Sequence, residues 1–392
     1  MKICDLTQSY SVTSGGVRTY IHAKRAYIKN TCHEHILIVP GEKDEAIRDG
    51  NLTTYKVKGI SVPHCQPYRF ILRLDKVMRL LKIEKPDIVE LGDAYLLPQA
   101  GFYCRRQFGS SVVGFYHTDF PSAYVEPVMM ERFGEKVAGL SKKRAEQYAR
   151  DVYGRCDAAL ASTVQFTEKL KNLGVENVHK LYLGVDTDLF HPKQRDENLR
   201  KQLGFDSEDI AMFYAGRLDG EKRIDLIVNA FEKIQDRFPG KLIIMGEGRL
   251  KHWVQGKAEN NPQIIFLPYL HNRQELARHM ASADIYVTAG PHETFGLSVI
   301  EAQASGLCVL GVNGGALIER VPESLGVLSP VDCLDDMAEN MLALSRSNFR
   351  EKGSRAREWV TSHFTWRHTF EHLFRIYKDL YHRNEIAQRK TA

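Results

Sequence analysis

The fold of this chain is decided by the stretch Pro291-His292-Glu293-Thr294-Phe295-Gly296-Leu297-Ser298-Val299-Ile300-Glu301-Ala302. It follows an apolar run, 283–288, that predicts a buried strand. Glu293 is expected in the turn after that strand, and Glu301 about one and a half turns into the helix that follows. Phe295–Leu297 are expected in the first helical turn, where unpaired backbone N–H groups and the helix dipole favour an anion.

A phosphate bound at these amides would have one carboxylate on either side. Because carboxylates repel a phosphate, the two glutamates are expected to face hydroxyl groups. A sugar nucleotide carries hydroxyls on both sides of its pyrophosphate, on the ribose and on the transferred sugar. Two carboxylates eight residues apart also occur by chance, and the alternative is a helix start with an exposed acidic face.

Outward from this stretch, apolar strands alternate with amphipathic helices through both halves of the 392 residues, which predicts an α/β fold with two doubly wound parallel sheets. The expected strands are 2–6, 35–39, 53–57, 87–91, 112–116 and 158–162 in the first half, and 211–215, 241–245, 264–267, 285–288 and 308–312 in the second. The length suits two domains, 1–186 and 187–365, and a helical, aromatic-rich tail is expected from about 350 to 383. The carboxyl ends of both sheets are expected to meet at a cleft.

Two further turns carry residues suited to binding. Gly15 and Gly16 follow the first strand and open a helix, and a pair of glycines allows a bound group to approach the backbone. A plain tight turn explains this pair about as well. His117 and Asp119 follow the strand 112–116, where they either face the cleft or, together with Thr118, cap the helix after Pro121.

Cationic residues follow the first strand of the second half. Gly216 and Arg217 end that strand, and Lys222 lies five residues further on, so both cations can converge on one anion. Their charge would stabilise a leaving diphosphate. An exposed basic loop is the alternative.

Composition excludes several classes of protein. The seven cysteines form no C-x-x-C pair, which favours a reducing compartment over a disulfide scaffold, and no apolar run is long enough to cross a membrane. The net charge of +5 belongs to residues 1–190, with 27 Lys/Arg against 22 Asp/Glu, whereas residues 191–392 carry 27 of each. Nucleic acid is not an expected partner, because aromatic residues do not alternate with a basic stripe.

These motifs together resemble the retaining glycosyltransferases of family 4, whose E-x7-E signature matches Glu293 and Glu301 and continues in Glu301–Gly306. The segment 217–222 is similar to the family's G-R-L-x-x-x-K, and 184–192 to its G-V-D-x-x-x-F-x-P border. Within the family, 116–192 looks most like enzymes that glycosylate lipids, among them phosphatidylinositol mannosyltransferases and sulfoquinovosyldiacylglycerol synthases.

The resemblance implies the GT-B fold, with an acceptor-binding first domain, a donor-binding second domain, and a C-terminal helix of about 366–392 that packs back on the first. It implies transfer of a mannose- or glucose-type hexose, with retention, from a UDP- or GDP-sugar to a lipid or glycan hydroxyl. The implied catalytic residues are Glu293, His117, Arg217 and Lys222. The implied donor-binding residues are Gly15, Gly16, Gly216, Gly246, Glu247, Leu270, Thr294, Phe295, Gly296, Leu297 and Glu301.

No cofactor and no metal are expected. Asp186-Thr187-Asp188 has the form of a metal-binding D-x-D, but it lies in the border segment and is interpreted as a structural or hinge element. Cys308 stands where relatives usually have proline, and it is expected to begin a buried strand. Two alternatives stay open: a nucleotide-sugar epimerase of the same fold, and a non-catalytic subunit that binds sugar nucleotides.

A cytoplasmic protein is expected, with peripheral contact to an anionic inner membrane face as a further hypothesis. That hypothesis rests on the positive excess of residues 1–190 and on 68–82, which is basic and apolar at helical spacing. The ordinary interpretation of this segment, a helix that covers its own sheet, is favoured.

Overall fold

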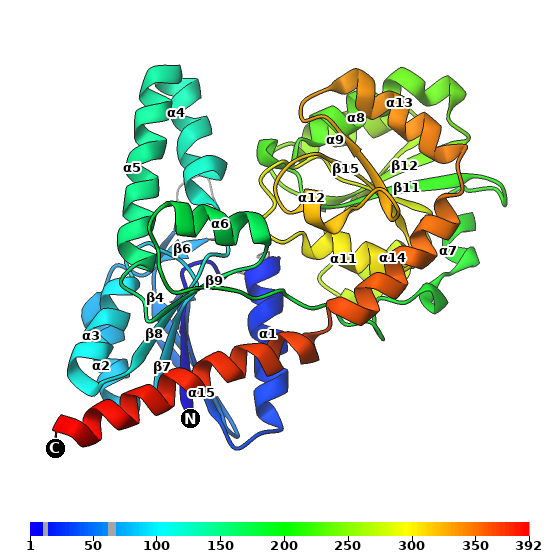
Figure 1. Ribbon diagram of the computed structural model, residues 1–392. Coiled ribbons are helices and arrows are strands. Elements are labelled where there is room, and N and C mark those ends of the chain that lie inside the picture. The colour runs from blue at the N-terminus through cyan, green and yellow to red at the C-terminus, as the bar shows by residue number, and fades with distance from the viewer. Residues whose placement is uncertain (11–14, 62–67, 392) are drawn as a thin grey trace. The chain divides into compact units, whose positions relative to one another are not determined.

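The computed structural model describes residues 1–10, 15–61 and 68–391, with side chains up to residue 386. The chain divides into two compact units, residues 1–183 with 366–392 and residues 184–365. Each unit is a sheet flanked by helices (Figure 1). The predicted α/β architecture with two doubly wound units is therefore confirmed.

The first unit holds an eight-stranded sheet. Its strands, in spatial order, are β10 (Val178–Lys180), β9 (Ala158–Ala161), β8 (Ser111–Phe115), β7 (Ile88–Leu91), β1 (Lys2–Leu6), β2 (Glu34–Gly41), β4 (Leu52–Lys58) and β3 (Glu45–Asp49). All neighbours are parallel except the β3–β4 pair. Its helices are α1 (Gly16–Lys29), α2 (Leu74–Glu84), α3 (Pro98–Phe108), η1 (Pro121–Val125), α4 (Glu126–Phe133), α5 (Glu135–Tyr153), α6 (Val164–Asn172) and α15 (Trp366–Thr391).

The second unit holds six parallel strands. They follow the spatial order β13 (Ile264–Pro268), β12 (Gly240–Glu247), β11 (Ile210–Arg217), β14 (Ile285–Val287), β15 (Cys308–Val312) and β16 (Gly326–Ser329). The helices are η2 (Pro192–Gln194), α7 (Glu197–Gln202), η3 (Gly220–Lys222), α8 (Ile224–Ile234), η4 (Gln235–Arg237), α9 (Lys251–Asn260), α10 (Arg273–Ala281), α11 (Leu297–Ala304), α12 (Leu317–Arg320), α13 (Leu334–Ser345) and α14 (Phe349–His363). Cys308 begins β15 and is fully buried, as predicted.

The helix α15 returns to the first unit and completes its core. Tyr377 is fully buried and donates to Glu90 of β7. Glu90 also accepts from Lys24 of α1 (2.8 Å), and Lys24 donates in turn to Asp5 of β1 (2.7 Å). A buried ammonium is stable only among such partners. This network therefore joins α15 to α1, β1 and β7.

Two sequence predictions of helix were wrong in part. The segment 68–82 begins as a short strand, β6 (Arg69–Phe70), which pairs with β5 (Ile60–Ser61), and Ile71 exchanges two hydrogen bonds with the Gln8 side chain. These bonds hold the backbone extended until α2 starts. The tail, expected to be helical over 350–383, is two helices, α14 and α15, which separate at Phe364, whose carbonyl accepts from the Val185 amide (2.8 Å). The bounds of α15 agree with the C-terminal helix of about 366–392 that the family resemblance implied.

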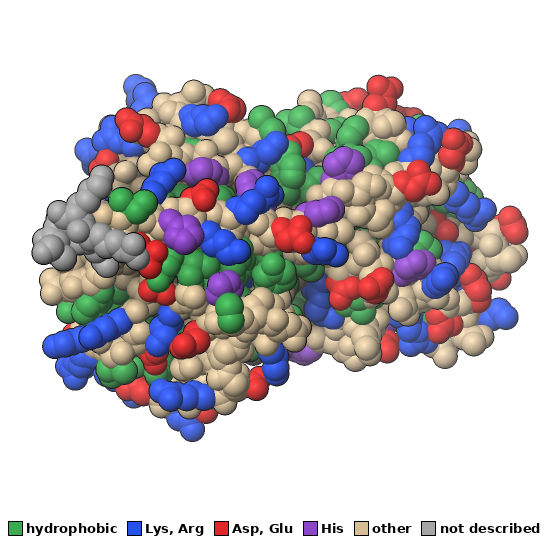
Figure 2. Space-filling model, turned by 60° about the horizontal axis from the view of Figure 1, so that its bottom comes forward, with side chains coloured by type: hydrophobic (Ala, Val, Ile, Leu, Met, Phe, Trp, Pro, Cys, Tyr) green, Lys and Arg blue, Asp and Glu red, His purple; other side chains and the backbone are tan. Residues whose placement is uncertain are grey.

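Surface charge is mixed. On the face drawn in Figure 2, basic and acidic side chains are interspersed, so neighbouring charges of opposite sign offset one another there. None of the helices in the described ranges has a stretch long and hydrophobic enough to span a lipid bilayer.

Candidate functional site

The strand order of the second unit marks a binding edge. The chain runs outward from β11 to β12 and β13, then returns to β14 and continues outward on the other side. In such sheets ligands bind beyond the carboxyl ends of the strands at this point of reversal, here between β11 and β14. Gly216 and Arg217 end β11, Lys222 lies in η3 just after it, and 293–297 follow β14. The topology therefore brings these predicted residues to one edge.

Lys222 and Glu293 connect the two loops directly. The Lys222 ammonium donates to the Glu293 carboxylate, and both side chains are about four-fifths buried, with exposures of 22% and 18%. Gly290 lies close to Lys222, because a Cβ built on Gly290 would stand 3.4 Å from the Lys222 Cδ. Partial burial excludes some of the water that would otherwise weaken this ion pair.

The Glu293 backbone is held as firmly as its side chain. Its carbonyl accepts from the Ala316 amide (2.7 Å), and a Cβ built on Gly315 would lie 2.6 Å from the same oxygen. Gly315 has a φ of +54°. Only glycine combines this close approach with a left-handed backbone at little cost, so the turn after β15 sets the position of Glu293.

Arg217 is oriented by two carboxylates. Its guanidinium donates to Asp219 (3.1 Å) and to Glu221, while Asp219 also accepts from the Arg249 amide (3.1 Å). The end of β11 and the turn that follows thus hold two cations, Arg217 and Lys222, in fixed directions.

The helix after Glu293 begins later than the sequence predicted. Gly296 has a φ of +79° and precedes α11, so only Leu297 of the three expected residues lies in the first turn. A left-handed residue cannot continue a right-handed helix, which explains the difference. The amides of Val299 and Ile300 both donate to the Gly296 carbonyl, at 3.0 and 3.2 Å.

Phe295 is buried and packs against Arg320 and Phe364. The Arg320 guanidinium lies 4.5 Å from the centroid of each ring, a distance typical of cation–π contacts. Thr294, between Glu293 and Phe295, is half-buried. The Phe295 ring therefore serves the core of this unit, whereas Thr294 stays nearer the surface.

Glu301 is bound by a residue that the sequence analysis did not identify. Arg273, at the start of α10, donates to Glu301 Oε1 (2.7 Å), and Glu301 is only 6% exposed. Arg273 also lies 5.0 Å from the Phe190 ring centroid. Its position at a helix start after β13, at the same edge of the sheet, was the available signal.

The remaining predicted donor residues follow β12 and β13. Gly246 pairs with Gly216 across β11 and β12, and a Cβ on Gly246 would lie 2.0 Å from the Gly216 carbonyl oxygen. Glu247 is exposed and pairs with Lys251 (2.9 Å), and Leu270 is half-buried beyond the end of β13. These residues share the edge with Lys222, but they belong to its outer strands.

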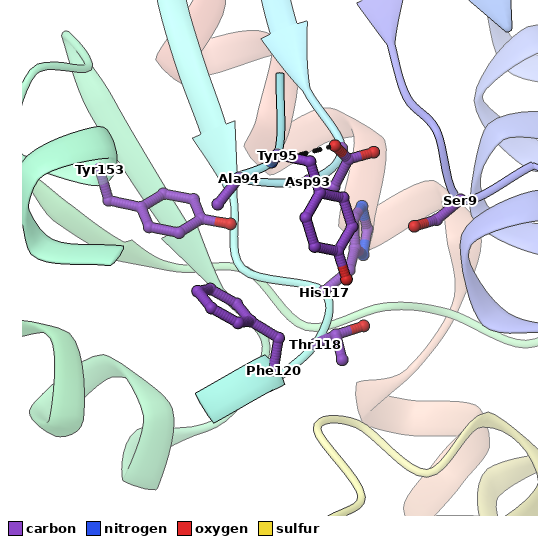
Figure 3. Close-up of a pocket in the computed structure, with 9 residues that line it drawn as sticks. Ser9, Asp93, Ala94, Tyr95, His117, Thr118, Phe120 and Tyr153 are labelled. Atoms are coloured by element: carbon purple, nitrogen blue, oxygen red, sulfur yellow. Dashed lines mark hydrogen bonds between the residues drawn. The ribbon is translucent and has the colours of Figure 1, made fainter. Parts of the chain in front are cut away.

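The first unit has a second point of reversal, between β1 and β7. A pocket lies at this edge, shown in Figure 3, among Ser9 after β1, Asp93 and Tyr95 after β7, and His117 and Phe120 after β8. The structure places His117, a predicted site residue, in this pocket, whereas Glu293, Arg217 and Lys222 belong to the other unit.

The His117 ring is packed between aromatic neighbours. It stacks on Phe115 with a centroid distance of 3.9 Å and lies 5.3 Å from Tyr20. Burial lowers the pKa of His117 to about 3, and the Lys24 charge acts in the same direction. The imidazole is therefore neutral near pH 7 and can exchange hydrogen bonds with a hydroxyl group.

Asp119 does not share this role. It is buried, accepts from Tyr116 (2.6 Å) and pairs with Lys169 (2.7 Å), so its carboxylate anchors α6 to the strand end. The predicted cap at Asp119 is absent too, because the turn that begins at Pro121 has Phe120 as its N-cap and no side-chain cap bond.

Asp93 is a pocket residue that the sequence analysis missed. It is 8% exposed and accepts from the Thr7 hydroxyl (3.0 Å) and the Gln8 amide (2.5 Å). Burial raises the pKa of Asp93 to about 6. The signal was its place directly after a predicted strand, the same criterion that identified His117.

Gly15 and Gly16 form the N-terminus of α1. Gly15 has a φ of −74°, and a Cβ built there meets no atom of the described residues within 4 Å. Thr13 and Ser14, the two residues before these glycines, lie outside the described residues.

The Asp186-Thr187-Asp188 segment forms a turn. The Asp186 carboxylate accepts from the amides of Asp188 (3.2 Å) and Leu189 (3.0 Å). In the part of the chain that the structure describes, no group of three or more His, Cys, Asp or Glu is arranged to hold a metal ion.

Two family models match the chain, one in each half. The model described as Glycosyltransferase Family 4 matches residues 14–189, and the model described as Glycosyl transferases group 1 matches residues 195–358.

Among curated proteins, the chain is 28% identical over 380 residues to the GDP-mannose-dependent alpha-(1-6)-phosphatidylinositol dimannoside mannosyltransferase of Mycobacterium tuberculosis, covering 93% of each chain. It is 25% identical over 292 residues to the sulfoquinovosyl transferase SQD2 of Arabidopsis thaliana, covering 72% of this chain and 54% of that one. Among solved structures, sucrose-phosphate synthase from Thermosynechococcus elongatus superimposes with a TM-score of 0.77 at 19% identity, over 97% and 98% of the two chains.

Proposed function

Since this chain belongs to the group 1, family 4 glycosyltransferases and has their GT-B fold, we propose that it transfers a hexose, with retention, from a nucleoside diphosphate to a lipid or glycan hydroxyl. The observation that carries the proposal is the Lys222–Glu293 pair at the point of reversal of the second sheet. One edge there offers a cation for a diphosphate and a carboxylate for sugar hydroxyls.

The diphosphate would bind Lys222 and Arg217. Arg217 ends β11 and Lys222 lies in η3 just after it, and each is oriented by carboxylates of its own unit. The start of α11 lies next to Glu293 in the chain, and its amides and dipole add to the positive potential. As the sugar–phosphate bond breaks, negative charge grows on the leaving diphosphate, and these fixed charges stabilise it.

The two glutamates would bind hydroxyl groups. Glu301 accepts from Arg273 through Oε1, and its carboxylate would also accept from the ribose hydroxyls. Glu293 would accept from hydroxyls of the transferred sugar, and its pairing with Lys222 connects sugar binding to diphosphate binding. Gly246, Glu247 and Leu270 would line the nucleoside at the outer strands.

The reaction would be a displacement on one face of the sugar. The bond from the anomeric carbon to the donor phosphate oxygen breaks, and a bond to the acceptor oxygen forms on the same side, which retains the configuration. The departing phosphate oxygen takes the acceptor proton, so no protein base is needed for this transfer. Glu293, already paired with Lys222, serves to position the sugar.

The acceptor would bind the first unit at the pocket of His117 and Asp93. A neutral imidazole and a buried carboxyl suit the hydroxyls of a polyol or sugar head group. The Mycobacterium relative is described as acting on a phosphatidylinositol dimannoside with GDP-mannose. A glycolipid acceptor and GDP-mannose are therefore the first pair to test, and peripheral contact with a membrane follows from such an acceptor.

Independence from metal ions is part of the proposal. The Asp186 carboxylate is engaged by its own turn, and Arg217 and Lys222 provide the positive charge that a diphosphate needs. Both features support transfer without a divalent cation.

The test is a panel of UDP-, GDP- and ADP-sugars, each with and without EDTA. The shift in melting temperature measures binding, and released nucleoside diphosphate measures turnover. We expect one donor, GDP-mannose first, to bind and turn over equally well in EDTA. Loss of binding in EDTA would contradict the metal-free mechanism. Rearranged sugar without a glycoside would indicate an epimerase, and binding without turnover a non-catalytic subunit.

A further inference from the structure

The first unit carries a helical hairpin whose end is exposed. Figure 1 shows α4 and α5 side by side, extending beyond the end of the sheet. Five large apolar side chains, Val128, Met130, Phe133, Val137 and Leu140, are between 42% and 58% exposed there. We call residues 128–144 the hairpin tip.

This exposure is unusual for a helix of a folded unit. No residue of α4 is buried, and every residue from 130 to 137 is exposed. Ala138 alone among the tip residues is buried. Large apolar side chains gathered at the end of one hairpin and exposed to water indicate an interaction site, because their exposure is unfavourable.

The charge of the tip indicates the partner. Arg132, Lys136, Lys142, Lys143 and Arg144 stand against two acids, Glu131 and Glu135, an excess of three positive charges over seventeen residues. Lys142 is engaged by Glu126 (2.6 Å), whereas Lys136 and Lys143 are exposed. Apolar residues among basic ones match the interface of an anionic bilayer, which offers acyl chains beneath negative head groups.

The base of the hairpin adjoins the acceptor pocket. Tyr148 of α5 donates to the carbonyls of Ala94 (2.6 Å) and Tyr95 (2.8 Å), and its ring meets Phe120 edge-on. Ala94, Tyr95 and Phe120 all line the pocket of His117. A lipid with its head group in that pocket would thus bind beside the element that carries the apolar tip.

The helix α2, which carries most of the segment 68–82, fits a membrane less well. Its apolar residues Val77 and Leu81 are fully buried in the core of the first unit. Three of the basic residues in this segment are engaged by acids: Arg73 and Arg79 pair with Asp75, and Lys76 pairs with Asp44. The apolar face of α2 therefore serves its own sheet.

We propose that the hairpin tip inserts its apolar side chains into the surface of a membrane that contains anionic phospholipid. The inference rests on the proposed function, since it places the membrane next to the pocket that would take the head group of a lipid acceptor. Met130, Phe133, Val137 and Leu140 would enter the interface, and Lys136 and Lys143 would meet the head groups.

The test is sedimentation with phosphatidylcholine vesicles that contain either no phosphatidylglycerol or about 30 mol% of it. The variant Phe133→Ser/Val137→Ser/Leu140→Ser is compared with Ile83→Ser, whose side chain is 71% exposed on α2. We expect wild type and Ile83→Ser to bind the anionic vesicles equally, and the triple variant to bind about tenfold or more weakly. All three proteins should bind donor alike, because the tip lies outside the second unit.

Two results would overturn the inference: wild type that does not bind anionic vesicles, or a triple variant that binds them as tightly as wild type. Light scattering tests the alternative partner of the hairpin tip, a second copy of the chain. A wild-type dimer that the triple variant converts to a monomer would assign the tip to self-association instead. Failure of the whole donor panel would count against the proposed function alone, because vesicle binding is measured without donor.

Discussion

Lys222 and Glu293, 71 residues apart in sequence, form an ion pair that joins the loops after β11 and β14. The pair bridges the strands between which the second sheet reverses its direction of growth. It gives the two residues a mutual dependence: removing either one changes the charge and the position of the other. The variants of this pair therefore have distinct expected signatures.

Glu293→Gln should lower turnover about a hundredfold, because the amide cannot place a full negative charge against the sugar hydroxyls. Affinity for the nucleoside diphosphate should be unchanged or higher, since Lys222 loses its competing carboxylate. Steady-state kinetics and calorimetry with the free diphosphate measure the two effects. Wild-type turnover in this variant would refute the role given to Glu293.

Lys222→Ala should weaken both the binding of the nucleoside diphosphate and turnover. Loss of a charge at the diphosphate is expected to raise the dissociation constant about tenfold, and turnover should fall because the leaving group is less well stabilised. The matched control is Lys257→Ala, which removes the ammonium of a similarly exposed pair with Glu232 (2.6 Å) on α8 and α9. Equal losses in both variants would mean that general destabilisation, and not the site, accounts for the effect.

Gly315→Ala tests whether the turn after β15 positions Glu293. The added Cβ would lie 2.6 Å from the Glu293 carbonyl oxygen, and the φ of +54° disfavours alanine, so a loss of about 1 kcal/mol in the free energy of unfolding is expected. Turnover should fall about tenfold or more because Glu293 shifts. Gly256→Ala, in open space within α9, should leave turnover intact and be neutral or stabilising. Normal kinetics in Gly315→Ala would disprove the positioning role.

Asp93 should give stability a particular dependence on pH. Its pKa is raised from 3.8 to about 6 in the folded state, so between these values the folded protein binds more protons than the unfolded chain. The contribution to stability is therefore greatest below pH 4 and is lost as pH rises through about 6, by about 3 kcal/mol.

The variant Asp93→Asn should remove this dependence of stability on pH. It also loses an acceptor for the Tyr95 amide (3.4 Å), so its free energy of unfolding at pH 4 should be lower than that of the wild type. Urea unfolding of both proteins at pH 4, 5, 6 and 7 measures the difference between them. A difference that stays constant across the four pH values would show that Asp93 does not titrate as described.

The fold was largely predictable, and the failures have physical causes. Buried parallel strands are continuous apolar runs, so β1, β11 and β15 could be located from sequence. The strand β3 could not, because it lies at the sheet edge and is mostly exposed. The local pattern is helical across 350–383 and does not reveal the break between α14 and α15, whose start at about 366 only the family resemblance implied.

The candidate site was likewise predictable only in part. Motif and topology together brought Arg217, Lys222 and Glu293 to one edge of the second sheet. The partner of Glu301, Arg273, was not predictable, because the contact depends on where α10 starts relative to α11. The start of α11 itself was misplaced, because the sequence could not reveal that Gly296 adopts a left-handed backbone.

Because Tyr377 is buried against Glu90, the core of the first unit can be completed only after α15 has been synthesised. The helix α15 follows the whole of 184–365 in the chain, so the ribosome has delivered the second unit before this helix emerges. Until then the Lys24 ammonium and its carboxylate partners lack the Tyr377 hydroxyl. The aromatic contacts of Tyr20 and Tyr27 with Phe370 are also missing. The second unit, continuous in sequence, can fold first although it is made later. A nascent chain released before residue 366 would therefore expose the unfinished core of the first unit to chaperones and proteases.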